Sequence, residues 1–383
     1  MMSSCPLCGS SHTVELPSPS RSQSITTAGV VLREPLAKRD CLGCGVVFRR
    51  PLDTIDKVQL YLEGYESYFA RPGAQTWDRP RYAAMAEWIL SVLGTWRPTS
   101  VLDVGCGAGW MLAALGSHLP PAKLVGVEPS PANAAVARDR GFEVTQGFLP
   151  DVRPTKGPFD LILSTNVMQH VEDPKAFLRA QAEQMSEDGR LVVICPDGSI
   201  AGNELLWVDH GFSFRAGHLQ WLAAAAGLTV VAQDVRLDGG PLQDKQILVL
   251  KRSPEPVVAK SPAADRRLHG DRVRYLNDWS RLARYLADHA VRAPGTVLNF
   301  GASMWSMLLA GHAPRYWECV ESCMVDGADG AFLGKPVQPT GALEPRGNWT
   351  IVLGVAPYSQ RKLKRRLSSW PCRVVTWADV VSR

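Results

Sequence analysis

Apolar and polar residues follow three different patterns along the 383 residues of this chain. Residues 1–60 show little apolar periodicity, and their middle is rich in Ser and Thr. Residues 61–252 repeat short apolar runs followed by helical patterns, which predicts βαβ units and a doubly wound parallel sheet. A proline-rich linker near residues 253–262 then leads into a third segment, residues 265–383.

The third segment returns to α/β alternation after an amphipathic helix expected at residues 273–290. It has one glycine turn, around Gly301, so we do not expect it to bind a second dinucleotide. We expect a smaller α/β Rossmann-like domain that closes over an acceptor molecule and contributes basic contacts. The basic run at residues 361–366 is typical of the solvated face of a helix. Four strands are predicted here, at residues 296–300, 316–321, 349–354 and 373–377.

Composition narrows the class of protein. Hydrophobic residues make up 45% and charged residues 21%, which excludes a disordered or collagen-like chain. The formal net charge of +5 suits an anionic small molecule as well as a polymer, so it does not by itself indicate nucleic-acid binding. The first residues lack the apolar core of a signal peptide, and no apolar run is long enough to span a bilayer. We therefore expect a soluble, cytoplasmic protein.

Four of the nine cysteines form two C-x2-C pairs, Cys5 with Cys8 and Cys41 with Cys44. Paired cysteines of this spacing in a reducing compartment indicate a metal site rather than four unrelated thiols. Four thiolates complete a tetrahedral Zn²⁺ site and leave no position for a catalytic water, so the predicted role is structural. A segment this poor in apolar residues needs such a site to fold. We predict a zinc-binding segment at residues 1–60.

The stretch VLDVGCGAGW, residues 101–110, carries the clearest ligand-binding pattern. An apolar strand runs into a loop with glycine at alternate positions, Gly105, Gly107 and Gly109, and a helix is expected from Trp110. Glycines let the backbone approach a ligand closely, and the helix N-terminus lies next to them. The G-x-G-x-G spacing differs from both the G-x-G-x-x-G dinucleotide fingerprint and a Walker A loop.

A second predicted strand, residues 123–127, ends at Glu128, whose carboxylate can accept hydrogen bonds from both hydroxyls of a ribose. With this acid, the loop resembles that of class I S-adenosylmethionine-dependent methyltransferases. The resemblance implies S-adenosylmethionine as cofactor, with Glu128 on its ribose. The other cofactor residues that it implies are Asp103, Gly105, Gly107, Gly109, Gln146 near the adenine and Asn166 after the fourth strand.

Two histidines are candidates for the chemical step. His170 follows the fourth strand, so it lies at the carboxyl edge where ligands bind, and it could take a proton from the methyl acceptor near neutral pH. The alternative is that it only shapes the pocket. Asp209 next to His210 could tune an imidazole or act as a carboxylate base. A capping and packing role before the following helix is the alternative for that pair.

The layout of the whole chain resembles the zinc-containing deoxysugar C-methyltransferases, which methylate a carbon next to the keto group of a nucleotide-linked sugar. His170 and His210 match the histidines of that family, and Tyr68 or Tyr65 would match its tyrosines after the zinc segment. The chain departs from the family at residues 207–210, which read Trp-Val-Asp-His in place of Tyr-x-Glu-His. It departs again at residues 238–243, which read Asp-Gly-Gly-Pro-Leu-Gln in place of His-Gly-Gly-Ser-Leu-Arg.

By this resemblance the substrate is a small molecule, such as a nucleotide-sugar, and the reaction is C-methylation. O-methylation of a sugar or another natural-product intermediate needs the same base, and the sequence does not separate the two. An RNA methyltransferase is disfavoured because no basic-aromatic stripe accompanies the cysteine pairs. A non-enzymatic protein that binds the cofactor and docks through the cysteine segment is a further alternative.

Overall fold

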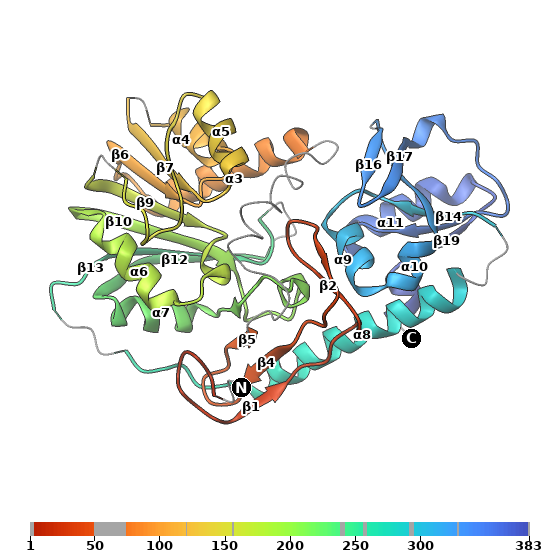
Figure 1. The fold of residues 1–383 in the computed structure, drawn as a ribbon, viewed down its shortest axis with the longest axis horizontal. Coiled ribbons are helices and arrows are strands. Elements are labelled where there is room, and N and C mark those ends of the chain that lie inside the picture. The colour runs from red at the N-terminus through yellow and green to blue at the C-terminus, as the bar shows by residue number, and fades with distance from the viewer. Residues whose placement is uncertain are drawn as a thin grey trace.

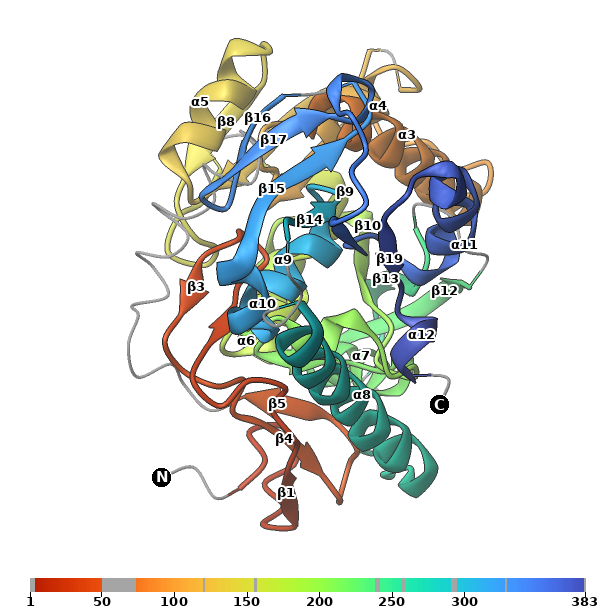
Figure 2. The same cartoon turned by 90° about the vertical axis from the view of Figure 1, so that its right-hand side faces the viewer.

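The computed structural model describes residues 4–49, 74–119, 121–154, 157–237, 242–255, 259–290, 295–327 and 329–381. They form a central α/β region, a C-terminal α/β region and a smaller N-terminal β region (Figure 1). Figure 2 shows the N-terminal strands next to helix α8 (Arg266–Ala290), which extends toward the C-terminal sheet. No helix in these described ranges has both the length and the apolar character needed to cross a membrane.

The central region is a seven-stranded sheet with the order β12-β13-β10-β9-β6-β7-β8. Only β13 runs antiparallel to its neighbours, so the expected doubly wound sheet is confirmed. Its strands are β6 (Ser100–Val104), β7 (Lys123–Glu128), β8 (Glu143–Gln146), β9 (Phe159–Thr165), β10 (Met185–Pro196), β12 (Leu228–Arg236) and β13 (Lys245–Arg252). Its helices are α3 (Ala74–Leu93), α4 (Trp110–Gly116), α5 (Pro131–Asp139), α6 (Pro174–Glu183) and α7 (Ala216–Ala225).

Both faces of this sheet are buried, which explains the continuous apolar runs in its strands. In β6, Val101 packs with α3 and α4 on one face, whereas Leu102 packs with α6 and α7 on the other. The strand order reverses between β6 and β9, because β7 follows β6 on one side and β9 lies on the other. A ligand-binding crevice is expected at the carboxyl ends of the strands at this point.

The C-terminal region is a six-stranded sheet with the order β16-β17-β15-β14-β18-β19, parallel except for the β16–β17 pair. This confirms a second, smaller α/β region. Its strands are β14 (Val297–Phe300), β15 (Val320–Val325), β16 (Gly330–Phe332), β17 (Lys335–Pro339), β18 (Thr350–Leu353) and β19 (Arg373–Val375). Its helical elements are α9 (Met304–His312), α10 (Pro314–Cys319), η4 (Thr340–Ala342), α11 (Pro357–Arg366), η5 (Leu367–Ser369) and α12 (Ala378–Val381).

Two expectations about this region were wrong in detail. The strand expected at residues 316–321 is helix α10 up to Cys319, and strand β15 begins only at Val320. Pro314 begins the helix, at a position where a backbone N–H would have no partner within the helix. Tyr316 is buried, and it contributes to an apolar run that resembles a strand in the sequence. Helix α8 starts at Arg266 rather than at residue 273, because the Asp265 carboxylate accepts hydrogen bonds from the first N–H groups of the helix.

The N-terminal region is not an independent layer. Its antiparallel sheet has the order β1-β4-β5-β11, from β1 (Thr13–Glu15), β4 (Lys38–Cys41), β5 (Val47–Arg49) and β11 (Phe212–Ser213). The last of these strands comes from far along the chain. A hairpin of β2 (Ser24–Ile25) and β3 (Val31–Leu32) packs against α9, where a Cβ atom on Gly311 would lie only 2.5 Å from the Ile25 side chain. The N-terminal region therefore contacts both α/β regions.

Candidate functional site

A cavity of about 1080 Å³ opens at the carboxyl edge of the central sheet. Residues after β6 and β9 line it, as expected for the point where the strand order reverses. Pro6, Thr27 and Arg49 line it from the N-terminal region, and Met304 lines it from α9. Its volume lies at the upper end of the roughly 300–1000 Å³ typical of small-molecule sites, so it can hold two small ligands side by side.

The glycine loop forms one wall of this cavity. Gly105, Gly107 and Gly109 have φ values of 78°, 53° and 80°, in the left-handed region that favours glycine. A Cβ atom on Gly105 would lie 2.5 Å from Val167, so the loop has no room for a side chain there. Gly105 and Gly107 line the cavity, whereas Gly109 packs behind the loop against the Phe142 ring.

Glu128, at the end of β7, lines the same wall and is buried. One carboxylate oxygen accepts a hydrogen bond from the Gly107 N–H at 2.8 Å, and the other accepts one from the Ser130 N–H at 2.9 Å. Burial raises the pKa of this carboxyl above its ordinary value. Each oxygen has a second lone pair, so Glu128 can hold the loop and still accept hydrogen bonds from a ligand.

Asp103 lies beneath the loop and is 1% exposed. Its Oδ1 atom has no hydrogen-bond donor among the described residues. Burial, together with the nearby charge of Glu128, raises the pKa of the Asp103 carboxyl to about 7. Asp103 does not itself line the cavity, so its carboxylate could act on a cationic ligand such as S-adenosylmethionine only through its charge from behind the loop.

The two remaining predicted cofactor residues differ in their placement. The Gln146 side chain is exposed at the end of β8 and does not line the cavity, whereas the next residues, Gly147 to Pro150, do. Asn166 follows β9 with a φ of 57° and lines the cavity. Its Oδ1 atom is buried without a hydrogen-bond partner among the described residues.

Two further short segments line the cavity. The 3₁₀ turn η2 (Met168–His170) presents His170, and the segment after η3 (Asn203–Leu206) presents His210. Their rings meet edge to face with centroids 4.9 Å apart. His170 Nδ1 lies 3.0 Å from the Asp209 carbonyl, and His210 Nδ1 lies 3.2 Å from the Glu204 carbonyl. A carbonyl only accepts hydrogen bonds, so each Nδ1 is assigned the proton and each Nε2 is the unprotonated nitrogen of its ring.

The charges around the two imidazoles differ. Burial, and next the charge of His170, lowers the pKa of His210 well below its ordinary value, so His210 is neutral at neutral pH. Asp209 does not line the cavity. Its carboxylate accepts hydrogen bonds from the N–H and hydroxyl of Thr27, and its Oδ2 atom lies 3.7 Å from His170 Nδ1. The carboxylate of Asp209 therefore lies behind His170, where an imidazolium would be stabilised. The tyrosines Tyr68 and Tyr65, and residues 238–241, are outside the described residues.

The sequence analysis missed a buried charged pair next to the segment that presents His210. Lys38 donates from Nζ to the Glu204 carbonyl at 3.1 Å, and one Glu204 carboxylate oxygen accepts from the Ser213 hydroxyl at 2.6 Å. Burial lowers the pKa of Lys38 to about 8 and raises that of Glu204. Lys38 and Glu204 are 166 residues apart, so no local motif could have indicated their contact.

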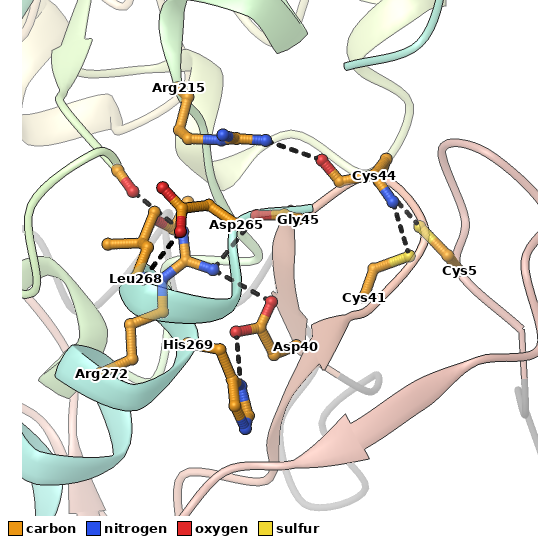
Figure 3. Close-up of polar contacts among 12 residues, drawn as sticks. Cys5, Asp40, Cys41, Cys44, Gly45, Arg215, Asp265, Leu268, His269 and Arg272 are labelled. Carbon is orange, nitrogen blue, oxygen red and sulfur yellow. Dashed lines mark hydrogen bonds and ion pairs between the residues drawn. The ribbon is translucent and has the colours of Figure 1, made fainter. Parts of the chain in front are cut away.

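The four paired cysteines converge in the N-terminal region, as Figure 3 shows for three of them. The Sγ atoms of Cys5 and Cys44 are 3.8 Å apart, those of Cys8 and Cys41 are 3.6 Å apart, and all four lie within 4.8 Å of one another. A tetrahedral Zn²⁺ with Zn–S bonds of about 2.3 Å needs sulfur atoms roughly 3.8 Å apart. The four thiolates therefore fit one tetrahedral metal ion.

Arginine side chains join this cysteine cluster to the rest of the molecule (Figure 3). Arg272 of α8 is 1% exposed and donates to the Asp40 carboxylate, next to Cys41, at 3.0 Å. It also donates to the carbonyls of Gly45 at 3.1 Å and Gly198 at 2.8 Å. Gly198 follows Asp197, which lines the cavity, so the cluster is linked by a short path to the acceptor end of the site.

In comparisons with known proteins, the central part of the chain matches a protein family. Residues 77–233 match the family model described as "Methyltransferase domain". The ubiquinone biosynthesis O-methyltransferase of Azorhizobium caulinodans is 33% identical over 102 residues, 24% of this chain and 38% of that protein. The trans-aconitate 2-methyltransferase of Rhodococcus jostii is 28% identical over 127 residues, 31% of this chain and 50% of that protein. The chain thus spans half or less of the length of these two relatives.

Solved structures are similar to about half of the chain. The mitomycin 7-O-methyltransferase is 22% identical, with a TM-score of 0.44, and the match covers 52% of this chain and 62% of that one. A plantazolicin methyltransferase solved with S-adenosylhomocysteine is 16% identical, with a TM-score of 0.39, covering 51% of this chain and 93% of that one. The family match and the curated relatives support a methyltransferase domain in the central part of the chain. The resemblance to deoxysugar C-methyltransferases stays a prediction.

Proposed function

We propose that this protein transfers a methyl group from S-adenosylmethionine to a small-molecule acceptor bound in the same cavity. One observation carries the proposal: the glycine loop, Glu128 and the paired imidazoles of His170 and His210 all line a single cavity. The match of residues 77–233 to a methyltransferase domain supports it.

On the cofactor side, the backbone at Gly105 and Gly107 leaves room for close approach, and the Glu128 carboxylate would accept hydrogen bonds from the ribose. Asp103 would balance the positive charge of the cofactor. S-adenosylmethionine supplies an electrophilic methyl group, so the protein has to place the acceptor in line with it and accept the acceptor's proton.

On the acceptor side, His170 is the better of the two candidate bases. Its Nδ1 atom donates to the Asp209 carbonyl, so Nε2 is the atom that would take the proton. The Asp209 carboxylate behind the ring favours the imidazolium that forms. Among the described residues no carboxylate forms an ion pair with His210, and its lowered pKa opposes protonation. In this proposal Asp209 is a positioning residue, and His210 is a neutral contact for the acceptor.

The finer proposal is C-methylation next to the keto group of a nucleotide-linked deoxysugar. The cavity lining includes the cations Arg49, Arg81 and Lys245 among a larger number of carboxylates, and these three cations would contact a phosphate-bearing acceptor. His170 would remove the proton alpha to the carbonyl, and nearby donors would stabilise the enolate oxygen. O-methylation is the second candidate, because one relative named above is an O-methyltransferase and the same base can deprotonate a hydroxyl.

We further propose that the metal at the four cysteines is Zn²⁺ and that its role is structural. Four sulfur ligands leave no coordination position for a substrate or a water. The cluster is tied through Arg272 to the loop at Gly198 rather than facing the cavity. Its effect on the reaction would therefore be to hold the acceptor end in shape.

The test is transfer of a deuterated methyl group, followed by mass spectrometry, with nucleotide-linked keto-deoxysugars and hydroxylated intermediates as separate acceptor panels. Binding of S-adenosylmethionine is first established by calorimetry. A general base contributes about 10²–10⁴-fold, so His170→Asn should lower the single-turnover rate by that factor with unchanged cofactor affinity. The control is His118→Asn, on an exposed position away from the cavity. Normal cofactor affinity with no transfer to either panel would favour the non-enzymatic alternative.

A further inference from the structure

The β2–β3 hairpin of the N-terminal region lies between the two other regions, next to the acceptor end of the cavity. Ile25 forms a bridge with Trp207, and its carbonyl accepts a hydrogen bond from the Val208 N–H at 3.0 Å. On the other side, Gln23 donates to the Ala310 carbonyl of α9 at 2.8 Å. The turn of this hairpin is therefore fixed from two directions, next to the segment that presents Asp209 and His210.

Thr27, in that turn, makes two hydrogen bonds to one carboxylate. Its backbone N–H donates to Asp209 Oδ1 at 2.9 Å, and its hydroxyl donates to Asp209 Oδ2. The same Oδ2 atom lies 3.7 Å from His170 Nδ1. Thr27 also lines the cavity. A continuous chain of contacts thus runs from the hairpin through Asp209 to the imidazole of His170.

We propose that Thr27 is a positioning residue for His170, which holds the Asp209 carboxylate in place and shares its charge, and thereby sets the basicity of the imidazole. The inference rests on the proposed function only where it calls His170 the base. The effect on the imidazole itself can be measured without any acceptor. It gives the N-terminal region a role in the chemical step beyond carrying a metal site.

The direction of the effect follows from where the negative charge is stabilised. A hydrogen bond to an ionised carboxylate stabilises the charged form. Without the Thr27 hydroxyl, less of the negative charge on Asp209 Oδ2 is stabilised by a hydrogen bond. A proton on His170 would then be attracted more strongly, so the pKa of His170 should rise. Without the charge, as in Asp209→Asn, the imidazolium loses its counter-charge and the pKa of His170 should fall. A purely structural role for Thr27 predicts no such pair of opposite shifts.

Other charged groups near Asp209 and His170 stay in place in all of these variants, so they cancel in the comparison. Lys38 of β4 interacts with Asp209 and Glu204, and Arg49 of β5 interacts with Lys38. The charges of His170, Lys38 and Lys245 each lower the pKa of His210. The groups that face the pair, or line the cavity next to it, are Lys38, Arg49, Glu172, Glu204, His210 and Lys245.

The experiment is an NMR titration of the full-length protein with ¹³C-labelled histidine, with the His170 signal assigned by its absence in His170→Asn. Thr27→Val should raise the pKa of His170 by about half to one unit, and Asp209→Asn should lower it by about one unit. Thr27→Ser keeps the hydroxyl and should restore the pKa to within about 0.2 units of the original value. The matched control is Thr26→Val, which removes the bond from the Val30 N–H to the Thr26 hydroxyl within the same turn but leaves Asp209 untouched.

An unchanged pKa in Thr27→Val, or an equal change in Thr26→Val, would overturn the inference. A second readout is the acid limb of the single-turnover rate, which should move to higher pH in Thr27→Val and to lower pH in Asp209→Asn. Shifts of the NMR pKa with no movement of the rate profile would support the role of Thr27 and contradict His170 as the base. The failure of the inference and that of the proposed function are thus distinguishable.

Discussion

The first strands of the central and C-terminal sheets have nearly the same sequence, but we propose a ligand site only at the carboxyl edge of the central sheet. Strand β6 and the residue after it read Val-Leu-Asp-Val-Gly at residues 101–105, and strand β14 with its following residue reads Val-Leu-Asn-Phe-Gly at residues 297–301. Both strands lie inside a sheet between two parallel neighbours, β7 and β9 in one case and β15 and β18 in the other.

The difference lies in how the polar residue of each first strand is satisfied. Asp103 Oδ1 has no hydrogen-bond donor among the described residues. Asn299 is fully engaged, because its Nδ2 atom donates to the Gly301 carbonyl at 2.7 Å and to the Ser306 hydroxyl at 2.9 Å. Its Oδ1 atom accepts from the Tyr316 hydroxyl at 3.0 Å. The polar residue of the C-terminal strand is thus satisfied by side chains of its own region, whereas one oxygen of the corresponding residue in the central sheet is not.

The acids after the second strands show the same contrast. Glu128 ends β7, is buried and lines the cavity. Asp326 follows β15, is exposed and is held by both terminal nitrogens of Arg366, at 2.7 Å and 3.0 Å. The two acids therefore differ in place, since one lies in the cavity lining and the other in an exposed ion pair, and the shared strand-glycine pattern does not indicate which.

The largest effect should come from removing the metal, which tests whether the ligand edge of the central sheet depends on the N-terminal region. Purified protein should contain one zinc per chain by elemental analysis. Structural zinc contributes about 10–16 kcal/mol of apparent binding free energy, so Cys41→Ser should unfold the N-terminal sheet and abolish turnover. Cofactor affinity at the glycine loop should change only a few-fold. Cys372→Ser, on a cysteine outside the cluster, is the control and should keep its zinc. Protein without metal after a reducing, chelator-free preparation would contradict this.

The next effect concerns the two acids. Glu128→Ala removes two hydrogen bonds to a ribose, each worth about 1.5–3 kcal/mol because the acceptor is charged. Cofactor affinity should therefore fall by about 10²–10⁴-fold in calorimetry. Asp326→Ala is the matched control at the end of the corresponding strand, and it should leave the affinity within about two-fold, since surface ion pairs contribute little. An unchanged affinity in Glu128→Ala would remove this residue from the cofactor site.

The sequence could predict that the glycine loop and Glu128 lie together, because local geometry encodes their placement, while their role in cofactor binding stays a prediction. The glycine loop, Glu128 and the cysteine pairs each lie within a few residues or at the end of one strand, and the structure brings Gly105, Gly107 and Glu128 to one wall. The acceptor half depends on contacts that no local pattern carries. Thr27 meets Asp209 across 182 positions, and strand β11 joins β5 of the N-terminal sheet. Side chains paired at such separations are fixed by the tertiary fold alone.

The third prediction uses the pKa of Asp103. Its folded-state pKa is about 7 against 3.8 unfolded, so the folded protein binds the extra proton and the free energy of unfolding falls as pH rises from about 4 to 7. Asp103→Asn should therefore stabilise the ligand-free protein above pH 7, by up to about 4 kcal/mol. Cofactor affinity of the original protein should weaken as pH falls below 7, because a protonated Asp103 no longer balances a cationic ligand. Calorimetry and thermal unfolding between pH 6 and 8 measure both, and a pH-independent affinity would contradict the role of Asp103.

The smallest effect on cofactor binding is expected from Asn299→Asp, which gives β14 the same Val-Leu-Asp pattern as β6. The carboxylate cannot donate to the Gly301 carbonyl or the Ser306 hydroxyl, and the lost bonds should lower the stability of the C-terminal region by about 1–3 kcal/mol. The number of cofactor molecules bound should stay at one per chain in calorimetry, because Ser306 and Tyr316 still occupy that edge and Asp326 remains paired with Arg366. The control is Ser306→Ala, which loses a similar bond without adding charge. A second binding event in Asn299→Asp would mean that the strand pattern alone makes the site, and that the contrast between the two sheets has another cause.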